Sequence, residues 1–143
     1  MVNWRSIKPL RSDNIINDFE KEINYSFPDD FKEFVKTNNG GRPSHKMFNT
    51  KVVKERVLNN MLSFNKEDNC NIWEMNDWNG KMKDWSKHGE MANYVAFAMD
   101  AFGNLICFDK TNDKIVFVNH ENLSVEYISN SFERFVKSLR KIK

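Results

Sequence analysis

Four carboxylates in the C-terminal half of the chain could bind a metal ion or act as a general acid and base: Asp100, Asp109, Asp113 and Glu121. Either chemistry requires the carboxylates to converge on one point. Residues 104 to 108 read as a strand, which at about 3.3 Å per residue separates Asp100 from Asp109 by roughly 15 Å. We therefore predict that the four carboxylates accept hydrogen bonds from backbone groups in turns.

The three histidines lack the spacing of metal ligands. His45, His88 and His120 are far apart in the chain. Glu121 follows His120, but no second histidine follows four residues later, so the helical zinc-protease pattern is absent. We predict that the histidines are surface or turn residues and that the chain has no metal ligand.

The cysteines and glycines form no catalytic motif either. Cys70 lies in a polar stretch and Cys107 in an apolar one, and the pair lacks the CxxC spacing of zinc or redox sites. There is no GxSxG elbow, and Gly40-Gly41 is not followed by the Lys-Ser/Thr of a phosphate-binding loop. We predict no disulfide, no cofactor, no catalytic residue and no enzymatic activity.

Composition indicates one globular domain over residues 1–143. The chain is 40% hydrophobic and 29% charged, and its twelve Phe and four Trp are enough bulky side chains to fill one core. A net charge of +2 gives no overall field towards nucleic acid or an anionic membrane. No apolar run approaches the roughly 20 residues of a membrane span, and no signal-peptide pattern is present. We expect a cytoplasmic protein, either a monomer or a weak dimer.

Two helices are predicted near the N-terminus, and we expect them to form a pair. Ser12 or Asp13 is the expected cap of the first. Its apolar stripe consists of Ile15, Ile16, Phe19 and Ile23. Pro28 is suited to the first turn of the second helix, since it has no N–H to lose there. The stripe of that helix consists of Phe31, Phe34 and Val35, and the segment 38–41 (Asn-Asn-Gly-Gly) tolerates a left-handed cap.

The rest of the chain predicts a sheet and a last helix. Segments 52–58 and 61–64 are modest strand candidates, and 94–99, 104–108, 114–118 and 124–128 are clearer ones. Their short connections predict an antiparallel meander, because parallel strands need longer crossovers. Ser129 or Asn130 would cap a final helix whose stripe consists of Phe132, Phe135, Val136 and Leu139. The predicted fold class is α+β: an antiparallel sheet of about four to six strands, packed by the N-terminal helix pair and the C-terminal helix.

The segment from Ile23 to Gly41, with its Phe-Pro-Asp-Asp-Phe start and Asn-Asn-Gly-Gly end, resembles the signature of the SUKH superfamily of Smi/Knr-type proteins. Three further segments are similar to that family's layout and follow in its order: 16–23, 97–109 and 115–121 with 131–135. The likeness covers about residues 12 to 140. Segment 69–90, rich in Trp and polar residues, fits no family pattern.

The resemblance implies a single SUKH-like domain that functions without catalysis. The superfamily includes bacterial toxin-immunity proteins, so it implies an immunity protein that binds a cognate toxin domain, often a nuclease. It also includes a fungal cell-wall-assembly regulator, so an intracellular regulatory or scaffold protein is the alternative. The 16 Lys against 6 Arg and the high Asn content are typical of an AT-rich bacterial genome and favour the immunity function.

The segment that departs from the family layout is our predicted partner-binding site. Its large aromatic and charged side chains are of the kind that anchors protein interfaces. The predicted contact residues are Trp73, Trp78, Trp85, Asp77 and Asp84. The alternative is that these tryptophans seal the core beneath a long connector.

A third function considered is nucleic-acid binding through a basic C-terminal face. The cations concerned are Arg134, Lys137, Arg140, Lys141 and Lys143, with Arg5, Lys8 and Arg11. We favour instead a solvated helix face whose charges complement the helix dipole. A hydrolase with an unrecognised site is the weakest of the alternatives.

Overall fold

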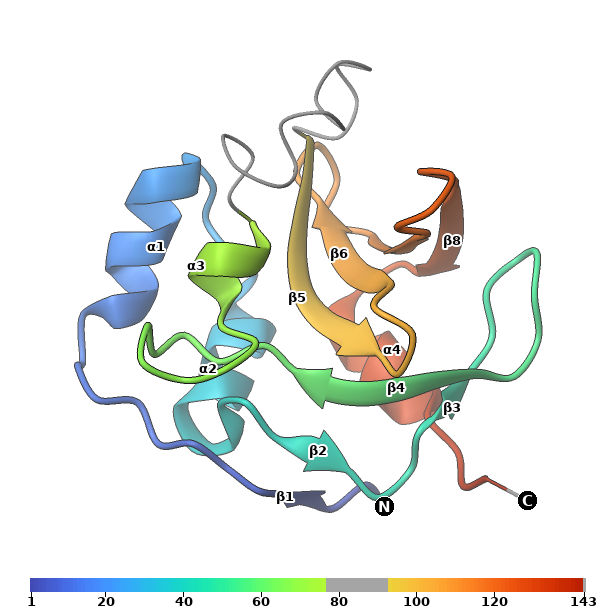
Figure 1. Cartoon of the computed structure of the whole chain (residues 1–143), viewed down its shortest axis with the longest axis horizontal. Coiled ribbons are helices and arrows are strands. Elements are labelled where there is room, and N and C mark those ends of the chain that lie inside the picture. Colours follow the sequence, from blue (N-terminus) through green and yellow to red (C-terminus); the bar gives the residue numbers. More distant parts are fainter. Residues whose placement is uncertain (77–92, 143) are drawn as a thin grey trace.

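The predicted α+β class is confirmed by a computed structural model, which describes residues 1–76 and 93–142 (Figure 1). In chain order the elements are β1 (Trp4–Arg5), α1 (Ile15–Ile23), α2 (Asp29–Asn38), β2 (Arg42–Pro43), β3 (Met47–Phe48), β4 (Arg56–Met61), α3 (Ile72–Met75), β5 (Tyr94–Asp100), β6 (Leu105–Asp109), β7 (Ile115–Val118), β8 (Val125–Ser129) and α4 (Phe132–Ser138). Within the described ranges no helix is both long and apolar enough to cross a membrane.

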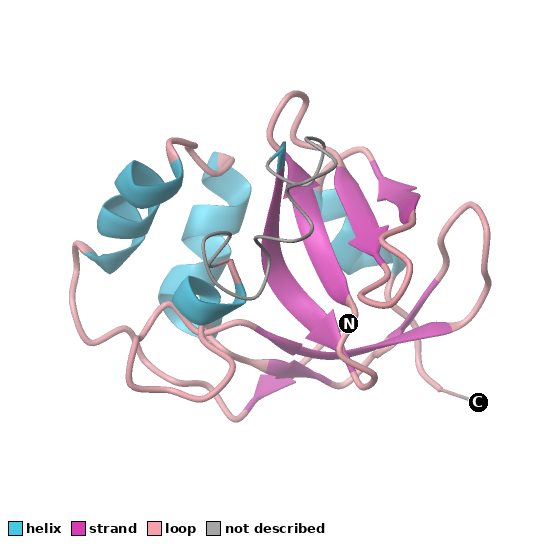
Figure 2. Ribbon diagram, turned by 45° about the horizontal axis from the view of Figure 1, so that its top comes forward, coloured by secondary structure: helices cyan, strands magenta, loops and turns pink. Residues whose placement is uncertain are grey.

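The main sheet is an antiparallel meander in the order β3-β4-β5-β6-β7-β8, and β1 pairs with β2 separately. Register shifts occur between Leu58 and Asn60, between Ala96 and Ala98, and between Ile115 and Val116. Bulges of this kind bend strands and increase their twist, so the sheet is strongly curled (Figure 2). The predicted strands after residue 94 are confirmed to within one or two residues at their ends.

The strand candidates 52–58 and 61–64 are wrong in their bounds. The structure has the two-residue strand β3 and a single strand β4, joined by a loop over residues 49–55. Val52 and Val53 are exposed in that loop, and Glu55 has a left-handed φ of 65°, so the extended conformation cannot continue through it. β3 is short, and the backbone of Arg140 pairs with its Met47 in both directions, at 2.9 and 3.0 Å.

The helix caps differ from the predicted ones by one or two residues. α1 has Asn14 at its N-cap, and Ser12 Oγ instead accepts a hydrogen bond from Asn14 N–H at 3.3 Å. Pro28 is the N-cap residue of α2 and lies just before the first turn. Ser131, not Ser129 or Asn130, caps α4, because its Oγ accepts from the N–H of Arg134.

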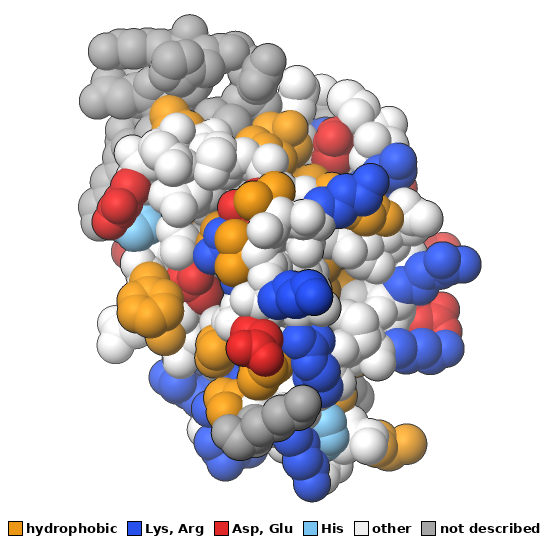
Figure 3. All heavy atoms as spheres, turned by 90° about the vertical axis from the view of Figure 1, so that its right-hand side faces the viewer, with side chains coloured by type: hydrophobic (Ala, Val, Ile, Leu, Met, Phe, Trp, Pro, Cys, Tyr) orange, Lys and Arg blue, Asp and Glu red, His pale blue; other side chains and the backbone are white. Residues whose placement is uncertain are grey.

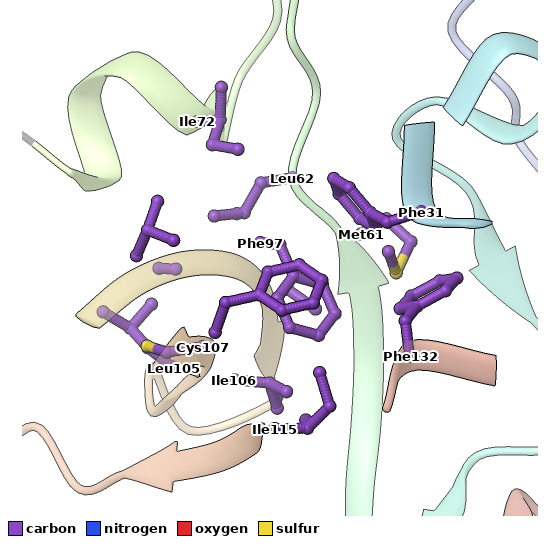
Figure 4. Packing of buried hydrophobic residues seen from close by; sticks show 14 of the residues in the cluster. Phe31, Met61, Leu62, Ile72, Phe97, Leu105, Ile106, Cys107, Ile115 and Phe132 are labelled. Atoms are coloured by element: carbon purple, nitrogen blue, oxygen red, sulfur yellow. The ribbon is translucent and has the colours of Figure 1, made fainter. Parts of the chain in front are cut away.

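Phenylalanines fill the space between the sheet and the helices. Phe31 of α2 and Phe132 of α4 meet at a ring distance of 5.0 Å, and both pack on Phe97 of β5 (Figure 4). Phe34 also contacts Phe132, so α2 packs directly on α4, while Phe19 brings α1 onto Phe27 and Phe64. α1, α2 and α3 therefore cover one end of the sheet and α4 its rear surface in Figure 1.

Candidate interaction surface

Two of the four carboxylates with possible chemistry serve the turns in which they lie, as predicted. Asp100 is buried, and its Oδ1 accepts from the N–H groups of Phe102 and Asn104 at 2.9 and 2.8 Å. Asp109 Oδ1 accepts from Thr111 N–H at 2.9 Å. The strand β6 runs between them, which places the two turns at opposite ends of the sheet.

The other two carboxylates make side-chain contacts. Asp113 Oδ1 accepts from the Tyr25 hydroxyl at 2.6 Å, and burial together with this hydrogen bond raises the pKa of Tyr25 well above its usual value. Glu121 Oε1 lies 3.9 Å from His120 Nε2, and His120 Nδ1 is 2.7 Å from Asn104 Oδ1. Over residues 1–76 and 93–142, no group of three or more His, Cys, Asp and Glu side chains could hold a metal ion.

Asn39 of the Asn-Asn-Gly-Gly segment belongs to the core of the fold. Its Nδ2 donates to Lys8 O at 2.6 Å and to Ser63 Oγ at 3.0 Å, and its Oδ1 accepts from Phe64 N–H at 2.9 Å. Asn39 is buried, so these bonds replace lost hydration. The side chain thus joins the N-terminal arm to the segment after β4.

The two glycines allow the chain to turn tightly after α2. The left-handed conformation falls on Gly40, with φ of 68°, while Asn39 keeps a φ of −55°. A Cβ on Gly41 would lie only 2.9 Å from Ile7 Cδ1 and 3.0 Å from Asn38 O. Asn39 and the two glycines of the segment that carries the family signature therefore hold the fold together.

An ion pair between a half-buried arginine and a buried glutamate lies at the far end of the sheet. Arg56 of β4 donates from Nη2 to Glu126 Oε2 at 2.9 Å and to Oε1 at 3.0 Å, and from Nε to Oε1 at 3.1 Å. The guanidinium carbon also lies 3.8 Å from the centre of the Phe117 ring. Glu126 on β8 is only 7% exposed, so its charge is neutralised within the fold.

Thr50 connects this ion pair to the 49–55 loop. Its hydroxyl donates to Glu126 Oε1 at 2.6 Å and accepts from the N–H groups of Val52 and Val53 at 3.1 and 2.9 Å. The N–H of Thr50 also donates to Val53 O at 2.9 Å. The loop is consequently held in one conformation, although Val52 is 72% exposed and Val53 is 36% exposed.

The loop lies beside the outer edge of β8, as Figures 1 and 2 both show, and Lys51 N–H donates to Tyr127 O at 2.9 Å. Two ammonium groups flank the Tyr127 ring: those of Lys51 at 5.5 Å and Lys114 at 5.9 Å from its centre. Val125, two residues earlier on the same side of β8, is 36% exposed. We call these side chains the β8 face: Lys51, Val52, Val53, Lys114, Val125 and Tyr127.

Positive charge predominates around the β8 face. Figure 3 shows this side of the molecule, where Lys and Arg side chains extend over a wide area with fewer acidic ones between them. In the part of the chain that the structure describes, neither Lys51 nor Lys114 forms a salt bridge. By contrast, Lys36 and Lys137 are paired with Glu33 and Glu133.

Comparison with known proteins identifies the family. A family model described as SMI1-KNR4 cell-wall, SUKH_6, matches residues 13–136. The chain belongs to the SMI1-KNR4 family. Among curated proteins, this SMI1-KNR4 chain is similar to the SPbeta prophage-derived uncharacterized protein YokK of Bacillus subtilis (strain 168). The two are 28% identical over 144 residues, which cover 91% of this chain and 75% of YokK.

Of the five contact residues predicted for this SMI1-KNR4 chain, the structure describes Trp73. Its Nε1 donates to Phe64 O at 2.8 Å, and its ring packs edge-on against Phe19 at 5.1 Å. The ammonium of Lys66 lies 4.1 Å from the ring centre. Trp73 is half-buried and packs on the core. This placement agrees with the alternative that the tryptophans seal the core beneath a long connector. Trp78, Trp85, Asp77 and Asp84 lie outside the described residues.

Sequence reasoning missed the β8 face. The sequence predicts Val52 and Val53 in a strand and gives Tyr127 no function beyond its place in a strand. One signal was available, because Glu126 is a single carboxylate inside an otherwise apolar strand. A charged residue at an inward-facing strand position predicts a buried partner, but it does not say which one.

Proposed function

We propose that this SMI1-KNR4 chain is a non-enzymatic binding protein, and that it is an immunity protein that neutralises a cognate toxin domain. The observation that carries the proposal is the β8 face. Its exposed valines, its tyrosine and its lysines, which form no salt bridge among the described residues, lie on the 49–55 loop, on β8 and just before β7. Contiguous exposed apolar patches rimmed by polar side chains mark interaction sites on globular domains. Neutralisation needs only a stable complex that covers the toxin's active site or substrate groove.

The use of polar residues within the fold supports the same proposal. Asp100 and Asp109, two of the four carboxylates with possible chemistry, accept hydrogen bonds from the backbone of their turns, and Asn39 bonds to the backbone in the core. The prophage origin of YokK supports a bacterial setting, in which members of this superfamily act as immunity proteins.

The fixed loop is suited to tight binding. Ordering a loop on association costs free energy, and a loop already held by Thr50 and Glu126 avoids most of that cost. Interfaces gain most of their affinity from a few central side chains, and rim charges mainly set the association rate. Trp73, one of the predicted contact residues, lies in α3 and remains a second candidate anchor.

A regulatory or scaffold function is the alternative, because the description of the matching family model, SMI1-KNR4 cell-wall, refers to the cell wall. Such a protein would bind endogenous partners in place of a toxin. The absence of a toxic neighbour would favour this alternative.

Co-expression tests the proposal. The C-terminal domain of a large secreted protein encoded beside this gene would be expressed with and without the chain, followed by co-purification. We expect the domain to stop growth when alone and to be harmless in a stable complex with the chain. A domain that remains toxic, or that does not co-purify, would contradict the immunity function. Lys21→Glu is a control for a charge change far from the β8 face, because Lys21 lies on α1 at the opposite end of the molecule. This variant should neutralise the domain as the wild-type chain does.

A further inference from the structure

We infer that the toxin docks on the β8 face, and that the surface it presents there carries both carboxylates and apolar side chains. This inference rests on the proposed function, since it assumes that the chain binds a protein. Beyond the proposed function, the inference specifies the surface on which the complex forms and the chemistry of the partner's surface.

Charge complementarity gives the first argument. Lys51, Lys54 and Lys114 are exposed, and no salt bridge among the described residues involves them. The carboxylate that β8 itself supplies, Glu126, is bound by Arg56 and Thr50 and is turned inward. The remaining acidic neighbour in the loop is Glu55. The face therefore presents an excess of cations that a partner's carboxylates can pair with.

The exposed apolar side chains give the second argument. Val52, Val53 and Val125 expose side chains whose burial would contribute roughly 25 cal/mol for each Å² removed from water. Tyr127 adds an amphipathic ring, and its hydroxyl donates to Asn130 Oδ1 at 2.6 Å. Tyrosine is enriched at interfaces because it supplies large contact area with few rotatable bonds.

The mixture of these side chains favours a protein over a nucleic acid. Phosphate groups would pair with Lys51 and Lys114, but they would leave the three valines against a hydrated, charged backbone. A protein surface that carries both apolar side chains and carboxylates satisfies both kinds of side chain at once. A second copy of the chain is also a poor occupant, because two identical basic faces repel each other.

Single charge reversals in the full-length chain test the inference, with the neighbouring secreted domain as the binding probe. We expect Lys51→Glu and Lys114→Glu each to weaken the complex about tenfold, mainly through a slower association rate, and to reduce its dependence on salt. Val52→Asp should weaken it by a similar factor. The matched control is Lys21→Glu, which makes the same charge change on α1 and should bind as the wild-type chain does. Circular dichroism and thermal unfolding would establish that each variant is folded, since all four positions are exposed.

The outcomes separate the two proposals. If the wild-type chain neutralises the domain and the three β8-face variants bind it with unchanged affinity, the docking site is wrong while the immunity function stands. If the wild-type chain forms no complex with the domain, both are wrong. Retention of the chain by a short DNA duplex or single-stranded RNA, lost in Lys51→Glu, would assign the face to nucleic acid. A dimer in light scattering that Lys51→Glu dissociates would assign it to a second copy.

Discussion

Arg56 on β4 and Glu126 on β8 form a bidentate ion pair, although three strands lie between β4 and β8 in the sheet. The two side chains can meet only because the sheet curls until its ends approach each other. The same curl brings the 49–55 loop beside β8, where Lys51 N–H reaches Tyr127 O. One ion pair therefore couples the closure of the sheet to the conformation of the proposed docking loop.

Removal of one member of this ion pair should strongly destabilise the fold. Arg56→Met leaves the Glu126 carboxylate buried without its partner, and we expect the free energy of unfolding in urea to fall by about 3 kcal/mol or more. The exposed pair Lys36–Glu33 is the control, and Lys36→Met should cost no more than about 1 kcal/mol. An equal loss of unfolding free energy in Arg56→Met and Lys36→Met would contradict a larger contribution of the Arg56–Glu126 pair to stability.

Asn39→Asp should destabilise the chain by about 1–3 kcal/mol. The carboxylate keeps the bond from Phe64 N–H but cannot donate to Lys8 O or Ser63 Oγ, and it adds a charge to a buried site. Asn112→Asp is a matched control, because among the described residues the Asn112 side chain makes one hydrogen bond, with its Oδ1 as acceptor from Lys114 N–H in an exposed turn. Equal urea midpoints for the two variants would contradict the structural role of Asn39.

Trp73→Phe should lower the free energy of unfolding by about 1 kcal/mol, because Phe64 O loses its hydrogen bond while most of the ring packing is kept. Phe102→Ala is the comparison, since Phe102 is 76% exposed and should change stability by less than about 0.5 kcal/mol. If Trp73 is also a contact residue, Trp73→Phe would weaken the toxin complex. Unchanged binding would leave it a structural residue only.

Asp68→Asn should have a pH-dependent cost. Burial alone would raise the pKa of Asp68, but hydrogen bonds from Ser63 and Asn65 and the charges of Arg11 and Lys8 outweigh it and lower that pKa. A lowered folded-state pKa contributes stability above the ordinary value of about 4, and this contribution is lost as the pH falls through the folded-state pKa. The difference between wild type and Asp68→Asn should thus be larger at pH 7 than at pH 3 in urea unfolding. The exposed variant Asp13→Asn is the control, and a difference for Asp68→Asn that grows at low pH would contradict the sign.

The meander and the helices could be predicted because their signals are local. Asp100 and Asp109 stand where strands end, and each makes hydrogen bonds within four residues along the chain. The helix stripes are likewise set by neighbouring residues. For these elements, the local pattern and the tertiary structure favour the same conformation.

The β8 face, the proposed interaction surface, could not be predicted because the contacts that form it are long-range. Thr50 and Arg56 reach Glu126 across 76 and 70 positions, and no periodicity encodes such a pairing. Val52-Val53 has high strand propensity, but the hydrogen bonds of Thr50 and the left-handed conformation of Glu55 outweigh that propensity here. The buried hydrogen bonds of Asn39 could not be predicted for a similar reason. The same residue type suits a helix cap, which the sequence predicts here, and a buried hydrogen-bond network, which the structure shows.

Both edges of the main sheet are occupied by backbone from elsewhere in the chain. Arg140 pairs with Met47 at the β3 edge, and Lys51 pairs with Tyr127 at the β8 edge. An unpaired edge can accept a strand from another molecule and so begin aggregation. These two short pairings therefore leave fewer backbone groups open to such an addition at either edge. If the residues around Arg140 were lost, the folded core could persist while the chains began to add to one another through β3.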